Sequence, residues 1–137
     1  MNRVLGWLAL GAVAWAAPAF AVEQAQFFAR TQQNVVDLCT AADDDPLQPE
    51  SIAFCHGFLI GAYSAHQTEH SGPGVPKLIC PPDPAPTRAE AIGMYIDWAK
   101  AHPEYANESS IESLFKFLIE KWPCPSVATG AAKGGGK

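Results

Sequence analysis

The sequence predicts a small all-α protein, a bundle of about four helices held together by two disulfides. Two observations lead to this prediction. Apolar residues recur at helical spacing in four separate segments, and four cysteines follow an export signal, so that an oxidising compartment would pair them. The chain of 137 residues is long enough for one domain with one core.

An N-terminal export signal is predicted over residues 1–21. Arg3 precedes an apolar run, and Ala19-Phe20-Ala21 places small residues at the two positions that a signal peptidase reads. Cleavage after Ala21 would release the working protein into an oxidising compartment, where disulfides persist.

The predicted mature chain begins at Val22 and comprises a helical domain over residues 22–124 and a disordered tail, rich in Gly, Ala and Lys, over residues 125–137. Without Arg3 it has eight Lys and Arg residues against 14 Asp and Glu, a net charge of −6. The cations are scattered singly, which disfavours binding to nucleic acid or to an anionic membrane surface. After the signal, no apolar segment approaches the roughly 20 residues that a membrane span needs.

The first helix is predicted from Glu23 to Leu38, where an irregular amphipathic stripe includes Phe27 and Val35. Residues 40–50 follow as a predicted loop, because a run of three aspartates and two prolines interrupts the pattern.

The central helix is predicted from Ser51 to His66, a segment that is apolar for almost four turns. Its two glycines, Gly57 and Gly61, fall on a ridge that has a small residue at every fourth position. Glycine costs a helix interior about 1 kcal/mol relative to alanine. We therefore expect another backbone to pack closely against this ridge. The alternative is that both glycines are neutral drift.

A long connection separates the central helix from two more. Residues 67–86 contain eight Pro and Gly residues and are predicted to be irregular. Thr87 then begins a helix with a capping box, because Glu90 stands three residues later, and Pro103 ends it. The last helix is predicted over residues 108–121, which show the cleanest helical periodicity in the chain.

The four cysteines are expected to form two disulfides. Helices joined by short loops pack antiparallel, which brings Cys39 at the end of the first helix close to Cys55 in the second. The same reasoning brings Cys80 before the third helix close to Cys124 after the fourth. Of the three possible pairings, this one needs the fewest assumptions.

Candidate catalytic and metal-binding residues are sparse. His66 and His70 have the spacing of a two-histidine metal half-site, but Gly and Pro follow at once, and an exposed helix end explains them better. Ser64 and Ser71 lie near these histidines without any known nucleophile motif. We therefore predict no catalytic residue, no metal site and no cofactor, and favour a binding protein over an enzyme.

Several segments match a known family in their order and spacing. They are Cys55-His56-Gly57 with Gly61, Cys80-Pro81-Pro82 with Thr87 and Glu90, His102-Pro103-Glu104, and Trp122-Pro123-Cys124. In these features the chain resembles the Rap/Tai family, the exported immunity proteins of bacterial type VI secretion systems. It departs from the family signature at Phe58, Ser64 and Glu90, where the family usually has Tyr, Asp and Gln.

The resemblance implies a small helical periplasmic protein that binds and blocks a peptidoglycan-cleaving amidase effector with a papain-like Cys/His site. A protruding loop would plug the cleft of that enzyme, and a homodimer would be in keeping with the family. The residues expected in the partner-binding loop are Glu69, His70, Ser71, Gly72, Pro73, Gly74, Val75, Pro76 and Lys77.

Two other functions are consistent with the same residues. One is a non-enzymatic periplasmic binding or chaperone-like module with a different partner, which would loosen between about pH 5 and 3, whereas an inhibitor would stay rigid. The other is a small hydrolase that uses His66 and His70, which would carry stoichiometric zinc.

Overall fold

The computed structural model describes residues 21–125. They form four α-helices and two short 3-10 helices, which are η1 (Gln24–Phe28), α1 (Gln32–Cys39), α2 (Gln48–Glu69), α3 (Arg88–Ala101), η2 (Pro103–Tyr105) and α4 (Ser110–Lys121). The prediction of an all-α bundle of about four helices is confirmed. The predicted signal, apart from Ala21, and the predicted tail, apart from Pro125, lie outside the described residues.

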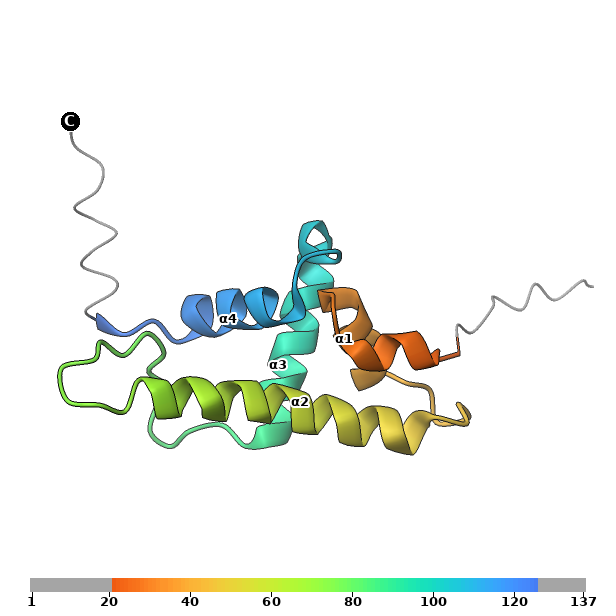
Figure 1. The fold of residues 1–137 in the computed structure, drawn as a ribbon, viewed down its shortest axis with the longest axis horizontal. Coiled ribbons are helices and arrows are strands. Elements are labelled where there is room, and N and C mark those ends of the chain that lie inside the picture. Colours follow the sequence, from red (N-terminus) through yellow and green to blue (C-terminus); the bar gives the residue numbers. More distant parts are fainter. Residues whose placement is uncertain (1–20, 126–137) are drawn as a thin grey trace, which may run out of the picture.

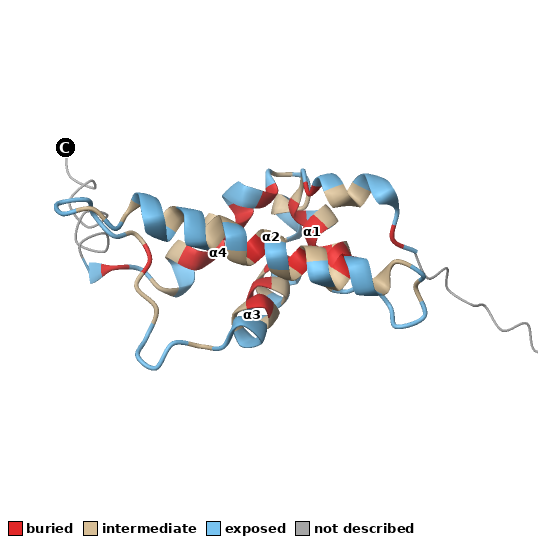
Figure 2. Cartoon of the chain, turned by 60° about the horizontal axis from the view of Figure 1, so that its bottom comes forward, coloured by how far each residue is buried: buried red, intermediate tan, exposed pale blue. Residues whose placement is uncertain are grey.

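The longest helix, α2, lies along the long axis of the molecule, with α4 beside it and α3 crossing both (Figure 1). η1 and α1 pack near the N-terminal half of α2 (Figure 1). Figure 2 shows that the buried residues lie where the four helices face one another. The largest side chains with almost no exposed surface are Tyr95, Phe117, Leu38, Gln32 and Val35.

The first predicted helix, residues 23–38, is broken in the structure. η1 ends at Phe28, the φ of 46° at its C-terminal cap Ala29 lies in the left-handed region, and α1 begins only after the cap Thr31. A distant segment causes the break: the amide of Gln32 donates to the carbonyl of Glu108, 3.0 Å away, so that the first turn of α1 is anchored on the loop before α4. The prediction of one continuous helix was therefore wrong.

The central helix is longer than predicted at both ends. It begins at Gln48 instead of Ser51, so the last residues of the predicted loop 40–50 are helical. Pro49 is accommodated there, because a proline in the first turn removes an amide that has no helical partner anyway. At the other end α2 continues to Glu69.

Gly57 and Gly61 lie on the outer face of α2. A Cβ atom at either position would meet nothing within 4 Å, so within the described chain no other backbone packs closely against them. The helix buries another face, through Cys55 and Leu59. That face is displaced by two residues, about 200° around the helix axis, so the expectation of close packing at the two glycines is not met inside this chain.

α3 begins and ends as its sequence signals indicate, whereas α4 ends at Lys121 as predicted but begins at Ser110, two residues later than predicted, after the cap Ser109. The hydroxyl of Thr87 accepts from the amide of Glu90, 3.3 Å away, and the Glu90 carboxylate accepts from the Thr87 amide at 2.7 Å, which confirms the capping box. α3 ends at Ala101, two residues before Pro103. In the core behind these helices, the hydroxyl of Tyr95 lies 3.0 Å from Oγ of Ser113.

Both predicted disulfides are present, Cys39–Cys55 and Cys80–Cys124. The first joins α1 to α2 over a sequence separation of 16, and the second joins the start of the connection to α3 with the end of α4 over a separation of 44. No cysteine in the described chain is free.

Candidate partner-binding site

A loop projects from one end of the molecule, between the C-terminal ends of α2 and α4 (Figure 1). Of the nine residues predicted for the partner-binding loop, Glu69 is the last residue of α2 and His70 is its C-terminal cap, so the loop proper is residues 71–77. All of these except Gly72, which is half-buried, are exposed, and most of the loop is pale blue in Figure 2. We call residues 71–77 the projecting loop.

The projecting loop forms a compact turn. The hydroxyl of Ser71 donates to the carbonyl of Thr68 at 2.8 Å, and the amide of Val75 donates to the carbonyl of Gly72 at 3.2 Å. Gly74 has a φ of 80°, a backbone conformation that favours glycine. The turn presents Val75, which is 40% exposed and is the one large aliphatic side chain of the projecting loop.

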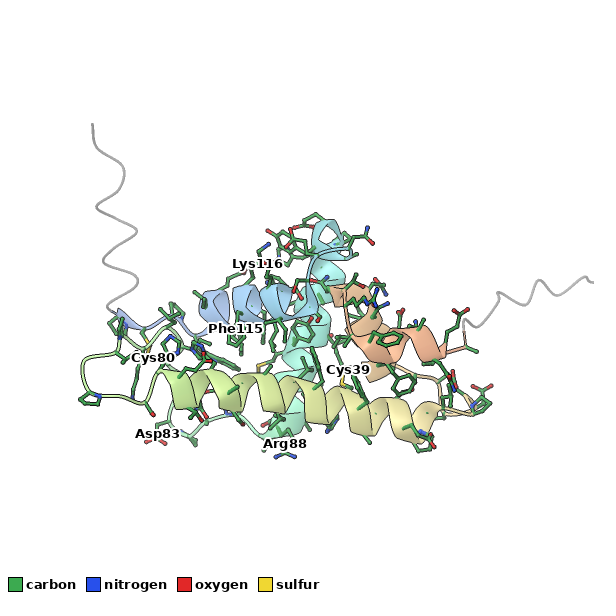
Figure 3. The ribbon with its side chains drawn as sticks, in the orientation of Figure 1. Cys39, Cys80, Asp83, Arg88, Phe115 and Lys116 are labelled. Atoms are coloured by element: carbon green, nitrogen blue, oxygen red, sulfur yellow. A yellow bond between two sulfur atoms is a disulfide. The ribbon has the colours of Figure 1, made fainter. Side chains whose placement is uncertain are left out.

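The C-terminal end of the loop is tied to the end of α4. The links include the disulfide Cys80–Cys124 and an antiparallel bridge between Ile79 and Pro123. The amide of Cys80 also donates to the carbonyl of Trp122 at 2.8 Å, and the amide of Cys124 donates to the carbonyl of Leu78 at 3.4 Å. Figure 3 shows Cys80 at the base of the loop. The loop therefore emerges from a fixed base at this end.

Its N-terminal end rests on a stack of rings. The ring of His66 lies 4.0 Å from that of His70 and 4.9 Å from that of Phe115, measured between centroids. Nδ1 of His70 donates to the carbonyl of His66 at 3.0 Å. Burial, followed by the neighbouring His70, lowers the pKa of His66, and Glu69 partly opposes this shift. Phe115 points from α4 towards α2 (Figure 3), so the stack joins the two helices.

An open hollow of about 440 Å³ lies behind the loop. Its lining combines the imidazoles of His66 and His70 with the polar side chains of Tyr63 and Lys77, and it includes no carboxylate. The sequence had shown the two histidines at one helix end but not the hollow, because the chain around Cys80 returns to this place only after the loop.

Two arrangements considered from the sequence, a histidine metal site and a Ser/His dyad, are not assembled among the described residues. No group of three His, Cys, Asp or Glu side chains among them could hold a metal ion. The hydroxyl of Ser71 is engaged with a backbone carbonyl, and His70 directs Nδ1 to another, so the two do not form a dyad.

A second surface lies between α3 and α4 and was not predicted. The rings of Trp98, His102 and Tyr105 stack on one another, and the ammonium of Lys116 lies 4.1 Å from the centroid of Tyr105. The side chain of Trp98 also donates to Glu120 at 3.1 Å. The spacing of Trp98 and His102, four positions apart at the end of α3, is the sequence signal that could have indicated the first contact of this stack.

Comparison with known proteins gives one result. The family model of the Rap1a immunity proteins matches residues 31–124, which includes α1 to α4, both disulfides and the projecting loop. Among curated proteins and solved structures, none matches the chain.

Proposed function

Because the chain belongs to the family of Rap1a immunity proteins, we propose that it binds and inhibits a secreted effector of the peptidoglycan-amidase class, and that the projecting loop enters the active-site cleft of that enzyme. The protein would act in the periplasm, after removal of an N-terminal signal. It would contribute no chemistry of its own, since blocking access of the cell wall to the catalytic residues is sufficient.

The observation that supports this proposal is the projecting loop with its two fixed ends. A loop that is already ordered loses little conformational freedom on binding, so more of its contact energy becomes affinity. The stack under His70 and the bridge at Cys80 hold the two ends, while the tip carries Val75 as an apolar anchor. Burial of an apolar side chain in a pocket of the partner is favourable because it removes apolar surface from water.

The compartment fits the same proposal. Two disulfides require an oxidising environment to form and persist, and a cell-wall amidase acts on a substrate in that environment. No helix in the described part of the chain is long and apolar enough to span a membrane.

The test uses a panel of purified cell-wall amidases, with release of products from peptidoglycan as the measurement. We expect one of them to bind tightly and to be inhibited at a one-to-one ratio. A variant that lacks residues 72–77 should neither bind nor inhibit.

A matched pair of substitutions separates the loop from the rest of the surface. Val75 in the loop and Ile111 in α4 are exposed to almost the same extent, 40% and 39%. V75E should weaken inhibition at least tenfold, a loss of about 1.4 kcal/mol that is typical of an interface anchor, and I111E should change it by less than twofold. Equal effects of the two substitutions would refute the loop mechanism, and the absence of binding to any amidase would refute the choice of partner.

A further inference from the structure

The backbone nitrogen of Val22 lies against the loop between α1 and α2. It donates a hydrogen bond of 2.6 Å to Oδ2 of Asp45. The side chain of Val22 is only 8% exposed and belongs to the common core. Two contacts therefore fix the position of this nitrogen: the packing of the Val22 side chain in the core and the hydrogen bond to the Asp45 carboxylate.

We propose that removal of the export signal after Ala21 converts this contact into an ion pair between the new α-ammonium group of Val22 and the carboxylate of Asp45, which anchors the mature N-terminus to the fold. A signal peptidase would supply the cleavage. Hydrolysis adds the hydroxyl of water to the carbonyl carbon of Ala21 and a hydrogen to the nitrogen of Val22. The amine then takes up a proton from solvent, since α-amino groups have an ordinary pKa of about 7.7–8.0 and are mostly charged at neutral pH.

The carboxylate of Asp45 is already fixed in the orientation that this pair requires. Its Oδ1 accepts from the amide of Leu47 at 2.8 Å, which leaves Oδ2 for the nitrogen of Val22. Before cleavage only the carboxylate carries a charge, whereas after cleavage the ammonium and the carboxylate attract each other as opposite charges at hydrogen-bond distance. Cleavage would therefore strengthen a contact without moving either atom.

The charge distribution favours a cation at this position. The sequence has no Lys or Arg between Arg30 and Lys77, whereas it has six Asp and Glu residues in that interval. The hollow next to Val22, about 480 Å³ in volume, is lined by Glu23 and Asp37 and by no Lys or Arg. The α-ammonium would be the positive charge that this acidic end otherwise lacks.

The consequence is a link between processing and stability. In the precursor the amide of Val22 carries no charge when it donates to Asp45, so the mature chain gains the attraction between two opposite charges and becomes more stable when the signal is removed. This inference concerns the scaffold and does not depend on the identity of the effector.

The test begins with the full precursor, exported and purified from the periplasm, and with the intact mass of the mature protein. We expect an N-terminus at Val22. Two changes are then introduced into the precursor: a threonine inserted between Ala21 and Val22, which moves the ammonium by one residue, about 3.8 Å, and Asp45→Asn, which keeps an acceptor for Leu47 but removes the charge. Each should lower the melting temperature by about 3–5 °C.

Combination of the two changes distinguishes an ion pair from two unrelated effects. The double variant should melt no lower than the more destabilised single variant, because either change alone already breaks the pair. Asp44→Asn is the matched control, since Asp44 is an exposed neighbour of the same charge, and it should shift the melting temperature by less than about 1 °C. A mature N-terminus elsewhere than Val22, additive effects of the two changes, or an Asp44→Asn effect equal to that of Asp45→Asn would each overturn the proposal.

Discussion

The two ends of α2 differ, although one continuous helix joins them. At the N-terminal end, side-chain hydrogen bonds hold the loop that leads into α2. The carboxylate of Asp45 accepts two of them, from the amides of Val22 and Leu47. At the C-terminal end, the described structure gives the projecting loop only local hydrogen bonds, to Thr68 and within the loop itself. The first end is part of the scaffold, and the second carries the exposed loop that we propose meets the partner.

The distance between these ends allows them to serve separate purposes. A helix of 22 residues is about 33 Å long, several times the Debye length of about 8 Å at physiological salt. Charges at the N-terminal end therefore have little influence on what binds at the other. Four sets of variants test this division between a scaffold end and a binding end of α2, and they follow in order of decreasing expected effect.

Removal of the second disulfide should have the largest effect. In C80A/C124A we expect the free energy of unfolding to fall by about 4 kcal/mol, because this bridge restrains a long stretch of the unfolded chain. Inhibition of the effector should be lost as well, since the base of the projecting loop is released. Urea denaturation and amidase assays measure the two effects.

The first disulfide provides the control. C39A/C55A should lose about 3 kcal/mol, because the bridge encloses a shorter segment, but it should still inhibit under conditions where it is folded. If both variants lost inhibition equally while folded, the division between the two ends of α2 would not hold.

A pair of serines tests the same contrast at smaller scale. Ser51 is fully buried and donates to the carbonyl of Leu47 at 2.6 Å, whereas Ser71 is exposed and donates to the carbonyl of Thr68 at 2.8 Å. We expect Ser51→Ala to cost about 1 kcal/mol in urea denaturation and Ser71→Ala less than about 0.5 kcal/mol. The reverse order would mean that the projecting loop contributes to the stability of the scaffold.

The ring stack beneath the loop should respond to acid. The pKa of His66 is lowered from its ordinary value of 6.5 by burial and by His70, so the unfolded chain binds a proton more readily than the folded one. The stability associated with neutral His66 is therefore present above about pH 6.5 and is lost as the pH falls below it. In His66→Asn the decrease in stability from pH 7 to pH 5 should be smaller. An unchanged decrease would show that other groups cause it.

Neutralisation of the acidic end should have the smallest effect on inhibition. The variant with Asp43→Asn, Asp44→Asn and Glu50→Gln leaves Asp45 intact, and its inhibition constant should change by less than twofold at 0.15 M salt, because these charges are screened from the projecting loop. Titration of the effector measures the constant. A loss of tenfold or more that increases at low salt would place the effector on the acidic end.

The sequence alone predicted the features that depend on near neighbours. The capping box of Thr87 and Glu90, the end of α3 before Pro103 and the amphipathic pattern of α4 all involve residues within about one turn of one another. The disulfide pairing followed from the same information, because the order of the helices left one pairing with the fewest assumptions.

The candidate site was only partly predictable for the same reason. The Pro and Gly content of residues 67–86 indicated an irregular connection, and the family resemblance indicated a binding loop within it. The support under the loop was not visible in the sequence, because Phe115 reaches His66 from a helix 49 positions later in the chain. Gly57 and Gly61 formed a regular pattern, but the pattern did not say which face of α2 the core would cover.

What the sequence by itself determined is therefore the all-α class with about four helices, the capping box of α3 and the pairing of the cysteines, since each rests on local chemistry or on helix order. Only the tertiary structure decided where the first helix breaks, which face of α2 is buried and what holds the projecting loop. The physical reason is competition for backbone and core contacts. The amide of Gln32 donates to the carbonyl of Glu108. No pattern within residues 23–38 predicts a hydrogen-bond partner that far along the chain.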